Sequence, residues 1–352
     1  MTNLKTDLST LLVDCTGVGF GGLTEASSQV LLNLASLKSY KILVVTDNLE
    51  LAIKVRHPNI KVKLFTRFRI LNLMNSFLWI LCIRLTKKSE YFLSFSPSLP
   101  SLAMGRHEGV QFVNDLQFLT QSHGIKYLYK RLILNLVIRN TKKIAVISDA
   151  TRLRLDSYKQ IKSQIRTIYL SGELKIKIET APTPLYDFLV IGHSIHKRGE
   201  KFLEICRNNR MFNARIVFLQ GQRHVDVQKF HELKNLTFRG AVSSDEYASL
   251  LANSRSLVMF SEPGTEGFGL PVAQALYLGR KTIISGDPAL SEISMGSSRI
   301  LDEEVDLITL EQLNLDSVEN QMKWPLRDRT WLNVAADVNE YLSFENPERN
   351  RG

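Results

Sequence analysis

Hydrophobic and polar positions in the first part of the chain follow the pattern of a βαβ unit. Residues 10–14 form a short apolar run that leads into a glycine-rich loop at residues 17–22. A helical pattern follows from Thr24 to about Leu37, with its apolar residues on one face. Residues 41–46 are then a continuous apolar run of strand length. A strand, a glycine turn, a helix and a buried strand in this order predict a parallel sheet.

The pattern continues through the first half of the chain and starts again in the second half. Around Thr180–Pro184 it lapses, and two prolines among small residues indicate a linker. We therefore predict an α/β protein of two Rossmann-like domains facing across a deep cleft. Such folds bind ligands at the carboxyl ends of their strands, so we expect the ligand in that cleft. The further predicted strands lie at residues 61–65, 91–95, 109–113, 143–148, 187–192, 215–219, 236–238, 256–260 and 281–285, and a helix lies at 202–207.

Length and composition agree with this picture. A chain of 352 residues exceeds the size of one hydrophobic core, and 44% hydrophobic with 23% charged residues is typical of a globular protein. The three cysteines are far apart and show no CxxC spacing, which argues against a disulfide framework or a zinc site and suits a reducing cytosol. The first residues do not resemble a signal peptide, so we expect a cytoplasmic protein.

A formal net charge of +10 favours a polyanionic partner. Much of the excess lies in two apolar-basic stretches, residues 67–88 and 126–143. Asn72, Asn75 and Arg84 make the first a poor bilayer span. Two interpretations remain open: a core helix with a solvated basic edge, or a helix lying on an anionic membrane surface. The clusters lack the motifs of RNA-binding modules, so we expect no nucleic-acid partner.

The most informative segment is residues 260–276. A strand ends near Phe260 and a helix begins near Pro271, a residue suited to the first helical position. Gly267 and Gly269 allow the backbone to pass close to a ligand, and amides at a helix start bind phosphate. Glu266 precedes this turn and Gln274 follows one helical turn later.

This run resembles the donor-binding signature of retaining GT-B glycosyltransferases of family 4, E-G-F-G-L-P-x-x-E-A. The resemblance implies that Glu266 contacts the transferred sugar. It also places Gln274 where the family has a second glutamate that holds the ribose hydroxyls. An amide can still bond a diol, although without the assistance of charge. The backbone of Gly267, Phe268, Gly269 and Leu270 would cradle the diphosphate.

Flanking segments extend the resemblance through the second half. Residues 238–246, with Gly240 and Val242, resemble the stretch that cradles the base, and residues 279–293 resemble the following strand and helix. Residues 192–199 are similar to the family's G-R-L-x-x-x-K-G loop, whose basic residues stabilise the departing diphosphate.

By spacing, Arg198 falls on the lysine position of that loop, and His193 falls on the arginine position. Lys197 is a neighbouring cation that could serve in the same role. The alternative interpretation of this segment is a solvated basic loop.

The first half matches more loosely. Asn114 stands where the family has a histidine that contacts the donor sugar, and Gly21 and Gly22 match paired glycines that back the acceptor and the diphosphate. Ser148 falls in a segment similar to a V-S-x-x-T-R step, but a simple helix N-cap explains it as well.

The predicted domains are residues 1–180 on the acceptor side, 181–325 on the donor side, and 326–352 as a C-terminal helix that crosses back to the first domain. In that helix Trp331, Ala335 and Leu342 would share one face.

The resemblance implies a retaining glycosyltransferase with Glu266, Asn114 and Arg198 in catalytic roles. Its donor would be a nucleoside-diphosphate hexose or deoxyhexose, mannose- or rhamnose-like. Its acceptor would be a glycan or lipid-linked glycan of bacterial surface polysaccharide such as O-antigen, capsule or lipopolysaccharide. The enzyme could lie peripherally on the inner face of the membrane. No D-x-D pair is placed for a metal, so we expect neither a metal nor a cofactor.

Two other classes remain as alternatives. Asn114 and Gln274 replace the usual residues, which would also suit a GT-B-like subunit that binds sugar nucleotides without catalysis. An epimerase or phosphorylase on the same fold is a third possibility, although no segment suggests the lysine-bound pyridoxal phosphate that a phosphorylase needs.

Overall fold

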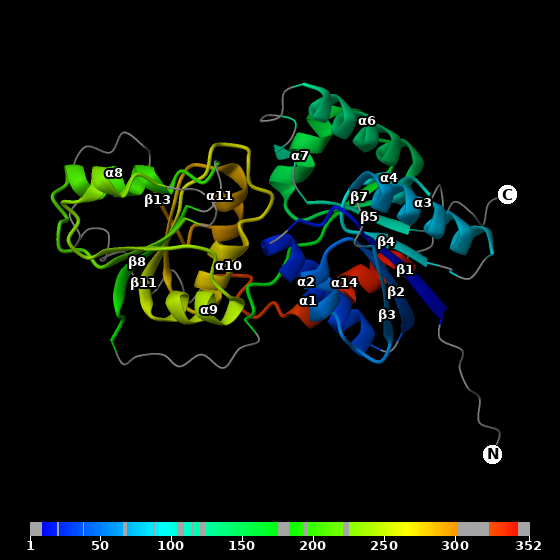
Figure 1. Cartoon of the computed structure of the whole chain (residues 1–352), viewed down its shortest axis with the longest axis horizontal. Helices are drawn as coiled ribbons and strands as arrows, with labels where there is room; N and C mark the ends of the chain where they lie inside the picture. The colour runs from blue at the N-terminus through cyan, green and yellow to red at the C-terminus, as the bar shows by residue number, and fades with distance from the viewer. Residues whose placement is uncertain are drawn as a thin grey trace, which may run out of the picture. The chain divides into compact units, whose positions relative to one another are not determined.

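The computed structural model describes residues 9–19, 21–37, 39–65, 69–86, 89, 91–103, 109–114, 116–117, 119, 124–174, 183–192, 196–220, 225–301 and 324–343. By their internal contacts the residues group into two compact units. The first runs to Leu170 and includes the chain from Trp331 onward, and the second is Ser171–Thr330. Each unit is built on one sheet of parallel strands with helices packed against it (Figure 1).

The sheet of the first unit has seven strands in the order β3-β2-β1-β4-β5-β6-β7, and every neighbouring pair is parallel. The strand order reverses between β1 and β4, which is the point where open α/β sheets bind ligands. In chain order the strands are β1 (Ser9–Cys15), β2 (Tyr40–Thr46), β3 (Ile60–Leu64), β4 (Tyr91–Ser94), β5 (Gly109–Val113), β6 (Lys143–Val146) and β7 (Gln164–Thr167).

Helices cover both faces of this sheet. Figure 1 shows α1, α2 and α14 on one side and α3, α4 and α6 on the other. Apolar side chains of the strands pack under them, among them Leu12 and Val45 with Ile80 of α3. The helices are α1 (Gly22–Ser36), α2 (Leu49–Lys54), α3 (Arg69–Leu85), α4 (Leu99–Leu102), α6 (Ile125–Asn140), α7 (Asp149–Tyr158) and α14 (Trp331–Ser343).

The C-terminal helix α14 belongs to the first unit and packs against α1. Trp331, Ala335 and Leu342 are all buried, so they share one inward face, as the sequence predicts. The buried ammonium of Lys143 donates to the carbonyls of Tyr341 and Leu342, each at 3.0 Å. A cation at the last carbonyls of a helix is favourable, and here it fastens the end of α14 to the start of β6.

The two apolar-basic stretches form α3 and α6, and both helices have an exposed apolar face as well as a buried one. On α6, the side chains of Ile125, Leu128, Tyr129 and Leu132 are exposed at helical spacing. The exposed apolar side chains of α3 include Met74, Leu78 and Leu85. Both helices therefore carry exposed apolar side chains as well as basic ones. Among the helices of the described ranges, none is both long and apolar enough to span a bilayer.

The second unit repeats the design with six parallel strands in the order β10-β9-β8-β11-β12-β13. Its strands are β8 (Tyr186–Ile191), β9 (Ile216–Leu219), β10 (Leu236–Arg239), β11 (Ser254–Met259), β12 (Lys281–Ile284) and β13 (Arg299–Ile300). Its helices are α8 (Gly199–Asn208), the 3₁₀ helix η1 (Val227–Phe230), α9 (Ser244–Ala252), α10 (Leu270–Tyr277) and α11 (Pro288–Ser294).

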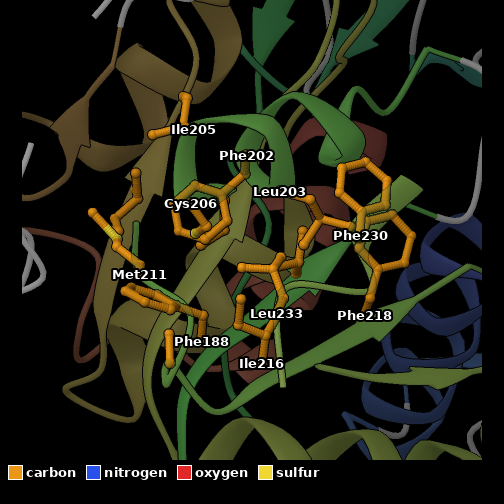
Figure 2. Close-up of a cluster of buried hydrophobic side chains, with 14 of the residues drawn as sticks. Phe188, Phe202, Leu203, Ile205, Cys206, Met211, Ile216, Phe218, Phe230 and Leu233 are labelled. Atoms are coloured by element: carbon orange, nitrogen blue, oxygen red, sulfur yellow. The ribbon is translucent and has the colours of Figure 1, made fainter. Parts of the chain in front are cut away.

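The core of the second unit is rich in aromatic side chains (Figure 2). Phe202 of α8 packs edge-on against Phe188 and Phe260, with ring centroids 4.9 and 6.0 Å apart. Aromatic pairs of this kind add to the stabilisation that burial provides. These contacts hold the amphipathic helix α8 against β8, β9 and β11.

Candidate functional site

The candidate site lies in the second unit, where two loops leave neighbouring strands. β8 and β11 pair in parallel, so the loops after them emerge at the same edge of the sheet. The amide of Arg198 donates to the carbonyl of Phe260 at 2.8 Å, and that of Glu262 donates to the carbonyl of His196 at 3.0 Å. An antiparallel bridge between Lys197 and Ser261 completes the contact. These backbone bonds fix the basic loop against the loop that carries Glu266.

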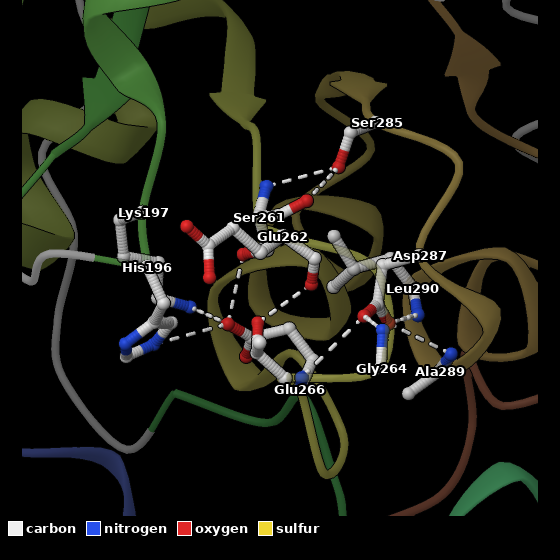
Figure 3. A network of polar contacts seen from close by, with 11 residues as sticks. His196, Lys197, Ser261, Glu262, Gly264, Glu266, Ser285, Asp287, Ala289 and Leu290 are labelled. Atoms are coloured by element: carbon white, nitrogen blue, oxygen red, sulfur yellow. Dashed lines mark hydrogen bonds and ion pairs between the residues drawn. The ribbon is translucent and has the colours of Figure 1, made fainter. Parts of the chain in front are cut away.

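Glu266 is the centre of a polar network (Figure 3). Its Oε1 accepts from the ammonium of Lys197 and from the hydroxyl of Ser261, the latter at 2.8 Å. Nε2 of His196 lies 3.4 Å from the same oxygen. Only 8% of Glu266 and 5% of Lys197 are exposed, so this is a buried ion pair. The structure thus joins two of the predicted donor-site residues, Lys197 and Glu266.

The carboxyl group of Glu266 is strongly acidic for a buried group. Burial by itself raises the pKa of Glu266, but the positive charge of Lys197 and the hydrogen bonds from His196, Lys197 and Ser261 outweigh it. The pKa of Glu266 therefore lies well below its ordinary value. At neutral pH Glu266 is a carboxylate, which can accept hydrogen bonds and cannot act as a general acid.

Asp287 holds the backbone of the loop that contains Glu266. It is completely buried, and its Oδ2 accepts from the amides of Gly264 and Glu266, at 2.8 and 3.4 Å. Its Oδ1 accepts from Ala289 and Leu290, at 2.9 and 3.2 Å, and so caps α11. Burial raises the pKa of Asp287, and the nearby carboxylate of Glu266 acts in the same direction. The loop is therefore anchored by a side chain outside it (Figure 3).

A glycine turn joins Glu266 to the start of α10. Gly269 precedes the helix with φ of 83° and ψ of 50°, a left-handed conformation that favours glycine. No described residue accepts a hydrogen bond from the amides of Phe268 or Gly269. Amides at a helix start with no internal partner are suited to an anionic ligand. The predicted helix start is confirmed, with α10 beginning at Leu270 and proline at its start.

Gln274 is buried in α10, and its side-chain amide makes no hydrogen bond within the described part of the chain. The segment after Leu170 passes directly beside it: a Cβ built on Gly172 would lie 2.2 Å from the carbonyl oxygen of Ala273 and 3.1 Å from the amide nitrogen of Gln274. The contact of Gln274 with a ribose stays a prediction.

The remaining predicted residues of this unit differ in burial. Arg198 is half-buried at the start of α8. Gly240 is exposed and Val242 half-buried in the turn before α9. Gly267, Phe268 and Leu270 are buried. His193 lies outside the described residues.

The predicted residues of the first unit lie at the carboxyl ends of its central strands. Asn114 directly follows β5, and its side-chain amide donates to the carbonyl of Phe95. Gly21 and Gly22 are exposed at the start of α1. Ser148 caps α7 by accepting from the amide of Thr151 at 3.1 Å, as the N-cap interpretation expects.

A buried carboxylate, which the sequence analysis did not single out, lies beside the first glycine loop. Asp14 accepts from the amide and hydroxyl of Thr16, at 2.9 and 2.6 Å, and from the hydroxyl of Ser98 at 2.7 Å. Burial raises its pKa to about 6, with a small further contribution from Asp47, although the hydrogen bonds oppose the shift. Asp14 ties the loop after β1 to the start of α4.

Several residues of the second-unit network were also missed by sequence reasoning. Ser261, Ser285 and His196 carry no motif of their own, since each acts through a partner distant in sequence. Asp287 before Pro288 carries the signal of a helix N-cap, but nothing in the sequence indicates its second role. In the described ranges, no cluster of three or more His, Cys, Asp or Glu side chains could hold a metal ion.

No protein-family model matches the chain, and no curated protein matches it significantly. Solved structures nevertheless match over almost its whole length. A sucrose-phosphate synthase from Thermosynechococcus elongatus aligns with a TM-score of 0.69 at 13% identity, covering 95% of this chain and 94% of that one. HepE from Anabaena, solved with UDP and glucose, aligns with a TM-score of 0.63 at 13% identity, covering 95% of each chain.

WaaG, described as a glycosyltransferase involved in lipopolysaccharide biosynthesis, aligns with a TM-score of 0.61 at 13% identity, covering 97% of this chain and 98% of that one. These proteins share the GT-B architecture, so the predicted α/β fold with two Rossmann-like domains is confirmed. At this identity the likeness establishes the fold, and the chemistry has to be argued from the site.

Proposed function

We propose that the protein is a glycosyltransferase that transfers a hexose or deoxyhexose from a nucleoside-diphosphate sugar to a glycan or lipid-linked glycan, with retention of configuration. The observation that carries this proposal is the buried pair of Lys197 and Glu266 beside a glycine turn, where the amides of Phe268 and Gly269 donate to no described residue. The resemblance of residues 266–271 to a donor-binding signature supports it. The GT-B neighbours, one of them solved with UDP and glucose, support the same donor class.

In this proposal the anionic diphosphate lies between Lys197 and the amides of Phe268 and Gly269. Lys197 neutralises the charge that develops on the departing nucleotide, and Arg198 adds a second positive charge nearby. Glu266 remains ionised, and it orients Lys197 and accepts from a hydroxyl of the sugar. Gln274 bonds the ribose hydroxyls with its otherwise unpartnered amide.

The transfer proceeds on one face of the sugar. The bond between the anomeric carbon and the diphosphate oxygen breaks, and the acceptor oxygen forms a bond to that carbon. The acceptor proton passes to an oxygen of the departing phosphate. The protein positions the two substrates and stabilises charge, and Asn114 contributes hydrogen bonding without a titratable group. We propose that neither a metal nor another cofactor takes part.

We further propose that the acceptor is presented at an anionic membrane on its cytoplasmic side, as in the assembly of a bacterial surface polysaccharide. The exposed apolar side chains of α3 and α6 support this idea, since Ile125 is 83% and Leu128 62% exposed. Residues 67–88 and 126–143 contain no Asp or Glu, while Lys130 and Arg131 are exposed on α6. Apolar residues flanked by cations are the combination that binds an anionic lipid surface.

Donor binding and turnover test the proposed activity. The intact protein is mixed with a panel of nucleoside-diphosphate sugars, and the shift in Tm ranks them, since a bound ligand stabilises the folded state. Transfer to lipid-linked and soluble glycans is then followed by release of the nucleotide. Binding without release or transfer for any donor would favour the non-catalytic subunit, and no binding at all would refute the proposal. The anomeric configuration of the product, measured by NMR, decides retention.

Membrane binding is tested separately with vesicles. We expect the protein to sediment with vesicles that contain anionic lipid, and Leu128→Ser with Leu132→Ser to reduce the bound fraction severalfold. Leu153→Ser on α7, which also removes an exposed leucine, is the matched control. Equal binding to zwitterionic vesicles, or unchanged binding of the double variant, would contradict the proposed surface.

A further inference from the structure

Asp287 lies outside the motif that carries the proposed chemistry. It caps its own helix and also accepts hydrogen bonds from backbone amides of the candidate site. A capping residue uses one side-chain oxygen for the first turn of its own helix. In Asp287 this is Oδ1, which accepts from Ala289 and Leu290. The other oxygen, Oδ2, accepts from Gly264 and Glu266, which are 23 and 21 residues away in the chain. Four amides converge on one buried carboxylate.

A second, independent contact joins the same segment to the far end of the glycine turn. A Cβ built on Gly269 would lie 2.4 Å from Cδ2 of Leu290, so the side chain of Leu290 packs directly under the turn. Ser285 adds a third contact, because its hydroxyl accepts from the amide of Ser261 and donates to the carbonyl of Ser261, both at 2.9 Å. Residues 285–290 therefore support the loop at its start, its middle and its end.

We propose that Asp287 is a positioning residue of the donor site, which sets the backbone of residues 264–266 so that Glu266 meets Lys197 and the amides of Phe268 and Gly269 face the diphosphate. Asp287 is buried and does not touch the donor. This inference rests on the proposed function, because it specifies how that same site is held in place.

The chemistry of the contact requires a carboxylate rather than an amide. An aspartate offers two acceptor oxygens, and here each oxygen receives two backbone N–H groups. In Asp287→Asn one oxygen remains and can still cap α11. The NH₂ group then faces the amides of Gly264 and Glu266 and cannot accept from them. This substitution therefore separates the two roles, keeping the cap and removing the tether.

The experiment compares Asp287→Asn and Asp287→Ser with the wild-type protein. The serine variant also keeps a capping oxygen and avoids placing a donor against donors, so it serves if the asparagine variant folds poorly. Asp226→Asn is the matched control, since Asp226 caps the 3₁₀ helix η1 at an exposed position and accepts from Gln228 at 3.2 Å. Each protein is assayed for UDP-sugar turnover and for amide hydrogen exchange across residues 260–270.

We expect both Asp287 variants to lower kcat/KM for the donor roughly tenfold, the factor expected for losing hydrogen bonds to a charged acceptor. The KM for the acceptor should stay unchanged, and hydrogen exchange in residues 260–270 should speed up. Asp226→Asn should behave as wild type. A folded Asp287→Asn with wild-type donor kinetics and exchange would overturn the inference, as would equal losses for donor and acceptor.

The two proposals fail differently in this experiment. If the wild-type protein turned over no nucleotide sugar, the proposed function would fail, and the exchange data would still decide whether Asp287 holds the loop. If the wild-type protein were active and the loop exchanged at the same rate in both Asp287 variants, only the positioning role would fail.

Discussion

Each unit buries a carboxylate near the carboxyl ends of its central strands. The charged form of this carboxylate is stabilised in the second unit and disfavoured in the first. Glu266 in the second unit is paired with Lys197, and its pKa is held well below the ordinary value. Asp14 in the first unit is surrounded by hydroxyl groups and the carboxylate of Asp47, and burial raises its pKa to about 6. The described residues around Asp14 include no ion-pair partner for it.

In the proposed donor site Glu266 carries a stable charge, whereas Asp14 holds a loop in place. Hydroxyl donors can satisfy a carboxylate whether or not it carries a full charge, so Asp14 can hold the Thr16 turn and Ser98 in either protonation state. In the proposed site, Lys197 attracts an anionic ligand only while it is charged, and Glu266 orients Lys197 only as a carboxylate. Three sets of substitutions test the differences between the two units.

The largest effect is expected from Lys197→Met. The substitution leaves the carboxylate of Glu266 buried without its cation, and removing one partner of a buried pair costs about 3–5 kcal/mol. We expect the free energy of unfolding of the second unit to fall by about 3 kcal/mol in urea titration. Donor turnover should fall by about 100-fold or more, because charge stabilisation of the departing phosphate is lost.

Lys201→Met is the control for Lys197→Met, since Lys201 pairs with Glu204 at 3.1 Å with both side chains more than 40% exposed. Such surface pairs contribute less than about 1 kcal/mol. Adding Glu266→Gln to Lys197→Met should restore most of the stability and none of the turnover. Similar losses for the Lys197 and Lys201 variants would show that the buried pair has no special role.

The pH dependence of stability should have opposite sign for the two carboxylates. Because the pKa of Asp14 is raised from 3.8 to about 6, its contribution is fully present below pH 3.8 and is lost as pH rises through 6. The charged form then costs up to about 3 kcal/mol at pH 7. Asp14→Asn should remove this slope and raise the stability of the first unit at pH 7 by about 2 kcal/mol.

For Glu266, whose pKa is lowered, the contribution is present above the ordinary value of 4.5 and is lost as pH falls below it. Urea unfolding of wild type, Asp14→Asn and Glu266→Gln between about pH 2 and 8 measures both trends. Parallel pH profiles for wild type and Asp14→Asn would contradict the raised pKa.

The smallest effect distinguishes the two glycine loops. Gly17 in the first unit and Gly269 in the second both have positive φ, 74° and 83°. Among the described residues no atom lies within 4 Å of a Cβ built on Gly17, so we expect Gly17→Ala to add backbone strain alone, about 1–2 kcal/mol. Gly269→Ala adds the collision with Leu290, and we expect about 1 kcal/mol more, measured by thermal unfolding.

Leu290→Ala provides the check on that interpretation. It removes the side chain under the turn, so its cost should be smaller in the Gly269→Ala background than in the wild-type background. Additive costs would indicate that the turn does not rest on Leu290.

Much of the fold could be predicted because its strands are buried and its helices amphipathic. The βαβ unit at the start of the chain was predicted within two residues at each helix end, as α1 spans Gly22–Ser36. β7 (Gln164–Thr167) was missed, since this edge strand is short and three of its four residues are polar. The domain boundaries at residues 180 and 325 stay predictions; by internal contacts the two units divide after Leu170 and before Trp331. The cleft also stays a prediction.

The candidate site was predicted in part. Glu266 and the glycine turn could be predicted from local residue types, since glycine marks a backbone with positive φ and proline marks the start of a helix. Spacing favoured Arg198 as the main cation, whereas the bridge between residues 197 and 261 aims Lys197 at Glu266. That bridge is a backbone contact between two loops, so residue spacing alone does not indicate which cation pairs with Glu266.

The sequence by itself determined the two parallel sheets, the glycine turn before α10 and the acidic and basic residues near it, because periodicity, turn residues and helix starts are local properties. Only the tertiary structure decided that Lys197 pairs with Glu266, that Asp287 accepts from the loop of Glu266, and that Asp14 is buried among hydroxyls. Each of these contacts joins segments that are distant in the chain. Their energies depend on burial and on distances of a few tenths of an ångström, which no residue pattern encodes.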